Sequence, residues 1–199
     1  MPAGINLTDL FNTAARAIQS NQVQLNRADS INGNHGDHMV EIFDVITQAM
    51  REKKTADAPA QLEYAAQLLR QRSASGSAKV IANGLAQEAN QVTGNAIPLE
   101  SALSVLQTLL NGGKSETGST APGLASGVVG AEGGKPKGVD WLGVGLNLLK
   151  ASKEAGIDFG ALAQSLVSGT EMGKSEHRSQ SGQLITNAIL KTLFSDSKM

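Results

Sequence analysis

The chain has 199 residues and a formal net charge of −1, with no cysteine and few aromatic residues. This length suits one domain with a real hydrophobic core, and the near-neutral charge argues against a general nucleic-acid binder, which would carry a basic patch or stripe. The lack of cysteine excludes disulfides and thiolate metal sites, and no apolar run approaches the ~20 residues that a membrane span needs. The first twenty residues also lack the order of a signal peptide, so we expect a soluble, cytoplasmic domain.

Helical spacing of apolar residues recurs along the chain, whereas strand-like alternation is hard to find. In chain order, the predicted helices cover about residues 7–27, 38–52, 57–72, 75–90, 98–111, 139–155, 158–168 and 182–195. Asn6, Asp57 and Asp158 are the expected N-caps of three of them. Most connections are short, so sequence neighbours should pack antiparallel. The sequence therefore predicts an all-α, single-domain bundle or barrel of eight antiparallel helices over residues 1–199.

Residues 114–137 interrupt this pattern. They are rich in Gly, Ser, Thr and Pro and have no usable period. A stretch of this length and composition predicts a flexible loop. A linker is the simplest interpretation, and a lid that closes over a ligand is the alternative.

Two short segments concentrate polar groups that could form a site. Residues 32–39 hold two Asn, two Gly, two His and one Asp in eight positions between two amphipathic segments. Residues 73–77 form a small, hydroxyl-rich turn that opens a helix and offers backbone N–H groups and hydroxyls to an anion. An ordinary serine N-cap is the simpler explanation of the second segment.

These segments resemble a known family in content and order. Leu25-Asn26 followed by residues 32–39 is similar to the Leu-Asn, five residues, Asp-Gly-Asp-x-Gly-x-Asn-Met pattern of the nucleotide-binding L domain of dihydroxyacetone kinases, which the related domain of bacterial fatty acid kinases shares. Residues 73–76 stand where those families have a Gly-Ala-Ser-Gly or Gly-Asn-Ser-Gly turn, and residues 161–172 and 177–179 are similar to their C-terminal motifs. The resemblance implies an eight-helix antiparallel barrel that binds ADP or ATP with Mg²⁺ and acts with a separate protein that carries the substrate.

The resemblance also implies roles for individual positions. The expected metal ligands stand at the places of the paired acidic residues, with two nearby carboxylates as substitutes: Asn32, Asn34, Asp29 and Asp37. The residues expected near the nucleotide and its phosphates are His35, Gly36, His38, Ser75, Gly76 and Ser77.

The metal positions depart from the family pattern, which leaves three functions open. Both paired carboxylates are asparagines and a third acidic position is Arg27, whereas Mg²⁺ prefers carboxylate oxygens. The first hypothesis is a divergent phosphotransferase acting with its partner protein. The second is a non-catalytic relative that binds a nucleotide, a phospholipid or a protein.

The third hypothesis is a metal-dependent hydrolase. Its ligands would be His35, His38 and Asp37, with Asp29 or His177 recruited in addition. Imidazole nitrogens suit Zn²⁺, Fe or Ni better than Mg²⁺.

Overall fold

The computed structural model describes residues 4–111 and 158–195, and this part of the chain is an all-α bundle. Its elements are α1 (Leu7–Ser20), α2 (Gln22–Ala28), α3 (His35–Glu52), α4 (Ala58–Arg72), α5 (Gly76–Ala89), α6 (Leu99–Asn111), α8 (Phe159–Ser168), the 3₁₀ helix η1 (Glu171–Lys174) and α9 (Glu176–Ser195). The fold class predicted from the sequence is confirmed.

The expected N-caps start their helices as the sequence indicates. The Asn6 side chain accepts from the backbone N–H of Thr8 at the start of α1. Asp57 caps α4 and Asp158 caps α8 in the same way. Each cap satisfies a backbone donor that has no partner inside its helix.

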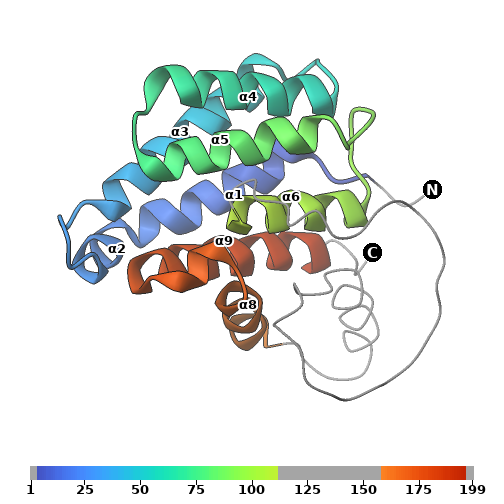
Figure 1. The fold of residues 1–199 in the computed structure, drawn as a ribbon. Coiled ribbons are helices and arrows are strands. Elements are labelled where there is room, and N and C mark those ends of the chain that lie inside the picture. Colours follow the sequence, from blue (N-terminus) through green and yellow to red (C-terminus); the bar gives the residue numbers. More distant parts are fainter. Residues whose placement is uncertain (1–3, 112–157, 196–199) are drawn as a thin grey trace, which may run out of the picture.

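Neighbouring helices pack antiparallel, as the short connections predict. Between α1 and α3, Gln19 bonds to Asp44 near one end of the pair, and Arg51 bonds to Asn12 near the other end. In Figure 1, α4 and α5 lie on one side of the bundle, α8 and α9 lie on the other, and α1 and α6 lie between them. This arrangement places the beginnings of α3 and α9 at the same end of the bundle.

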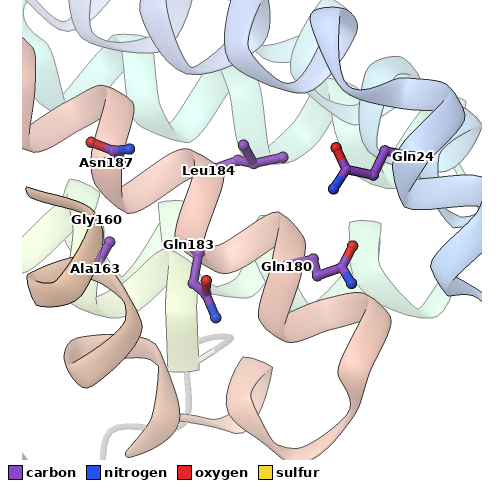
Figure 2. Close-up of a pocket in the computed structure, with 7 residues that line it drawn as sticks. All are labelled: Gln24, Gly160, Ala163, Gln180, Gln183, Leu184 and Asn187. Atoms are coloured by element: carbon purple, nitrogen blue, oxygen red, sulfur yellow. The ribbon is translucent and has the colours of Figure 1, made fainter.

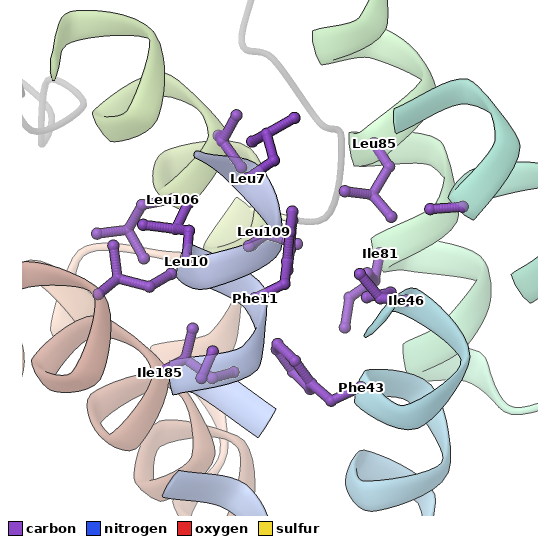
Figure 3. Packing of buried hydrophobic residues seen from close by; sticks show 14 of the residues in the cluster. Leu7, Leu10, Phe11, Phe43, Ile46, Ile81, Leu85, Leu106, Leu109 and Ile185 are labelled. Carbon is purple, nitrogen blue, oxygen red and sulfur yellow. The ribbon is translucent and has the colours of Figure 1, made fainter. Parts of the chain in front are cut away.

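The core forms around the apolar face of α1. Leu10 and Phe11 are fully buried, and Phe43 of α3 is fully buried opposite them. Figure 3 shows these side chains among others from α3, α5, α6 and α9. Burying each large apolar side chain contributes about 1.5–3 kcal/mol, so this cluster stabilises the scaffold that carries the polar turns.

Three predicted boundaries are wrong. The first predicted helix divides at Asn21, whose side-chain amide donates to the carbonyl of Ala17, while its backbone N–H donates to Ile18. These bonds close the last turn of α1, and α2 then starts again at Gln22. Helix α3 begins three residues earlier than expected, at His35, and α9 begins at Glu176, so residues 177–179 lie in a helix.

The predicted loop over residues 114–137 and the predicted helix over residues 139–155 lie outside the described residues. The described part still holds eight α-helices, because the first predicted helix is two helices in the structure. None of the helices in residues 4–111 and 158–195 combines the length and the apolarity needed to cross a lipid bilayer.

Candidate functional site

The turn between α2 and α3 is stabilised by Asp29 and Gly33. The Asp29 carboxylate accepts the backbone N–H of Ile31 at 3.1 Å and that of Asn34 at 3.3 Å. Desolvation by burial acts against these bonds, but the backbone donors outweigh it and hold the pKa of Asp29 below its usual value. Gly33 has φ 67, a left-handed conformation that glycine adopts without steric cost. Asp29 therefore has a structural role in the turn.

The first turn of α3 is fixed against α2. A Cβ on Gly36 would lie 2.2 Å from the carbonyl oxygen of Gln22, so only glycine allows this approach. The Asp37 carboxylate accepts hydrogen bonds of 2.8 Å from the side chains of both Asn26 and Gln22, and these donors lower the pKa of Asp37. Gly36 and Asp37, both expected in the site from the sequence, thus also hold two helices together.

His35, the first residue of α3, points toward α9. It is 5% exposed, and its Nε2 lies 3.1 Å from the hydroxyl oxygen of Ser181. That hydroxyl donates to the carbonyl of Arg178, so its oxygen accepts from the His35 Nε2–H. The imidazole ring also meets the ring of His177 edge-on, with centroids 4.8 Å apart.

Burial lowers the pKa of His35 to about 4, and the neighbouring His177 and Arg178 add to this effect. At neutral pH the ring is therefore uncharged. It acts as a hydrogen-bonding contact between α3 and α9.

The contact brings two helix N-termini together, because His35 begins α3 and His177 is the second residue of α9. We call the group formed by Asn34, His35, Ser175, His177 and Arg178 the helix-start junction. Two of its side-chain oxygens, Asn34 Oδ1 and Ser175 Oγ, are buried without a hydrogen-bond partner. Arg178 is exposed at its edge. The junction thus combines two N-termini, an exposed guanidinium and two unused polar atoms.

The serine turn, residues 73–77, is a regular helix start. The Ser75 hydroxyl caps α5 by accepting the backbone N–H of Ala78 at 3.1 Å, and the Ser73 hydroxyl lies 3.4 Å from it. A Cβ on Gly76 would meet nothing within 4 Å. The turn lies at the same end of the bundle as the start of α3 (Figure 1). A ligand that reaches Ser75, Gly76 and Ser77 as well as the helix-start junction stays a prediction.

The structure brings residues of α9 to His35. His177, which the hydrolase hypothesis would recruit, meets the His35 ring, and Ser181, which was given no role, bonds to it. The charge of Arg178 also acts on His35. The spacing of His177 and Ser181, four residues apart on one helix face, is the signal that could have revealed them. Asn32 is exposed in the turn, and His38 is half-buried in the first turn of α3.

The donors around the α2–α3 turn do not match the oxygen set that Mg²⁺ prefers. The carboxylates of Asp29 and Asp37 already accept hydrogen bonds from the fold, and Asn34 Oδ1 is a neutral oxygen. Across the described ranges, no three His, Asp or Glu side chains converge into a group that could hold a metal ion. Comparisons with protein families, curated proteins and solved structures found no match for this chain.

Proposed function

We propose that this chain is a phosphate-binding helical module, which binds the phosphates of ADP or ATP at the helix-start junction. The observation that supports this most directly is the His35–His177 contact, which joins the N-termini of α3 and α9. The first N–H groups of a helix have no partner inside it, and the helix dipole is positive there. Two N-termini that meet therefore favour an anion more than one does.

Side chains at the junction add donors of the kind that phosphate prefers. Arg178 is exposed in the first turn of α9 and lies near enough to His35 to lower its pKa. A guanidinium group binds phosphate oxygens in a bidentate way and keeps its charge at any physiological pH. The Ser175 hydroxyl, directly before α9, is buried and has no partner in the described structure.

The donor chemistry supports binding without a carboxylate-held metal ion. Asp29 and Asp37 accept hydrogen bonds within the turn and its packing, and the charge of Asp29 acts on His35, so Arg178 is the group that would offset the charge of a bound phosphate. We therefore favour the non-catalytic hypothesis, in which the chain binds nucleotide phosphates without transferring them. The choice of ADP or ATP over another phosphate compound rests on the resemblance to the kinase L domain.

One observation supports a second candidate function, the divergent phosphotransferase acting with a substrate-carrying protein. Asn34 stands at a position where that family binds metal, and its side-chain oxygen is buried without a donor. Such an oxygen could face Mg²⁺ once a nucleotide supplies the missing negative charge.

Calorimetric titration of the metal-stripped protein with ADP and ATP tests both candidates. The module predicts saturable binding that Mg²⁺ and Mn²⁺ change little, and a loss of at least about tenfold in affinity for Arg178→Gln, equivalent to about 1.4 kcal/mol. Arg51→Gln is the matched control, because Arg51 bonds to Asn12 on another face of the bundle. Binding that requires metal would favour the phosphotransferase. No binding, or equal weakening by both substitutions, would contradict the site.

A further inference from the structure

The tip of the turn between α2 and α3 is an exposed Asn-Gly pair, Asn32-Gly33. Helix α2, which leads into this turn, packs against both α3 and α9. In Figure 2, Gln24 of α2 lines a small pocket together with Leu184 of α9. The turn extends beyond these contacts, and Ile31 within it is 81% exposed. Packing therefore holds the base of the turn and leaves its tip in the solvent.

The hydrogen bonds of the turn leave one backbone donor unused. The Asp29 carboxylate accepts the N–H groups of Ile31 and Asn34, and the N–H of Asn32 also acts on it. The N–H of Gly33 has no hydrogen-bond partner among the described residues, and the same is true of the Asn32 side chain. A Cβ on Gly33 would meet nothing within 4 Å, so the space around it is open. An amide carbon and a free backbone nitrogen therefore stand next to each other with nothing to hold them apart.

We propose that Asn32 is a deamidation site, at which the fold permits the slow conversion of a neutral amide into a carboxylate. The Gly33 nitrogen loses its proton and attacks Cγ of Asn32, a C–N bond forms, and the side-chain nitrogen leaves as ammonia. The product is a five-membered succinimide. The attack is intramolecular, and glycine has no side chain to obstruct it.

Water then opens the succinimide at one of its two carbonyl groups. Cleavage of the bond between Cγ and the Gly33 nitrogen gives aspartate. Cleavage of the bond between the backbone carbonyl carbon and that nitrogen gives isoaspartate. In sum, an amide and water become an acid and ammonia without oxidation or reduction, so solvent water is the only co-reactant.

Another Asn-Gly pair, Asn83-Gly84, has the opposite environment. It lies inside α5, where the helix holds the backbone N–H groups in intrahelical bonds. Arg70 donates to Asn83 Oδ1 at 3.2 Å, and a Cβ on Gly84 would lie 2.8 Å from the side chain of Thr108. The amide carbon and the nitrogen of this pair approach each other only if the helix opens. The same dipeptide should therefore react in the turn and stay intact in the helix.

The new charge acts on the helix-start junction, a consequence that rests on the phosphate binding proposed above. The charge of Asp29 in the same turn already acts on His35 and His177. A carboxylate at Asn32 adds a second negative charge beside the N-terminus of α3. Because solvent screens exposed charges, we expect ADP to bind about two- to fivefold more weakly after deamidation. Deamidation would thus weaken the site in one direction as the protein ages.

Incubation of the native full chain in mildly alkaline buffer, followed by peptide mass spectrometry, tests the proposal. We expect an acid at Asn32, as separate aspartate and isoaspartate peptides, to form at least about tenfold faster than at Asn83, because the helix must open first. In guanidinium chloride the two pairs should react at similar rates. Asn32→Gln is the matched control, because glutamine keeps the carboxamide but must close a larger ring.

Two results would overturn the deamidation site. One is a native protein in which Asn32 reacts no faster than Asn83. The other is a difference between the two pairs that persists in guanidinium chloride, since the flanking sequence and not the fold would then cause it.

Calorimetric titration of Asn32→Asp and Asn32→Gln with ADP in metal-free buffer tests the consequence for the junction. The glutamine variant should bind like the parent, and the aspartate variant should bind about two- to fivefold more weakly. Equal affinities would overturn the link to the junction. A parent protein that does not bind ADP would overturn the proposed function together with this link. The deamidation itself is measured without ADP, so the two proposals fail separately.

Discussion

Replacing His35 with glutamine should flatten the dependence of stability on pH between neutral and mildly acidic conditions. Burial lowers the pKa of His35 from 6.5 to about 4 in the folded protein. In the unfolded chain His35 therefore binds a proton as the pH falls below about 6.5, whereas in the folded chain it stays neutral down to about pH 4. The stability that the folded protein has with a neutral His35 is complete above about pH 6.5 and is lost as the pH falls toward about 4.

The size of the effect follows from the same two values. They differ by about 2.5 pH units, which corresponds to at most about 3.4 kcal/mol. The assay stops at about pH 4.5, above the folded-state pKa of His35, so only part of this difference is traversed and we expect about 2 kcal/mol. Glutamine is neutral throughout and can still donate to the Ser181 hydroxyl, so the variant keeps the contact between α3 and α9.

Urea unfolding of both proteins at about pH 7.5 and about pH 4.5 measures the difference. The parent protein should lose about 2 kcal/mol more than His35→Gln over this interval. Carboxylates titrate in both proteins and cancel in the comparison. His38→Gln, on the same helix at a half-buried position, should behave like the parent. Equal losses in the parent and in His35→Gln would refute the assignment of His35 as a buried, neutral contact.

Two further predictions concern other polar and glycine positions. Gly36→Ala should destabilise the fold by about 1–3 kcal/mol, because its Cβ would collide with the Gln22 carbonyl, whereas Gly76→Ala should be neutral or stabilising. Thermal or urea unfolding compares the two variants, and equal changes in stability would contradict the packing argument. Glu88 is 1% exposed with one oxygen lacking a partner, and burial raises its pKa, so stability present below about pH 4.5 is lost as the pH rises through the folded-state value. The free energy of unfolding of Glu88→Gln, relative to that of the parent, should therefore be higher at pH 8 than at pH 5. The same difference in stability at both pH values would show that Glu88 is not buried as an acid.

Much of the fold was accessible from the sequence because it depends on local interactions. Asn6, Asp57 and Asp158 cap helices within three residues of themselves, and the apolar spacing of the helices reports the face that each one buries. The predicted bundle and most helix positions follow from these short-range rules. The break at Asn21 was missed because its side chain competes for a backbone carbonyl inside a segment with good helical spacing.

The candidate site could be predicted only in part. Residues 32–38 were recognised by their composition, and the structure does place them in one exposed turn and the helix start that follows it. Their individual roles depend on partners elsewhere in the chain. Asp37 bonds to residues of α2, and Asp29 bonds to the backbone of its own turn, which removes both from a simple set of metal ligands.

The amino-acid sequence by itself determined the helices, their caps and the polar turn, since each depends on residues close together in the chain. Only the tertiary structure decided what the turn faces. His35 and Ser181 are 146 residues apart in sequence, and packing of α1 against both α3 and α9 brings them into contact. Local patterns carry no information about such pairings, because many arrangements of amphipathic helices bury the same apolar faces.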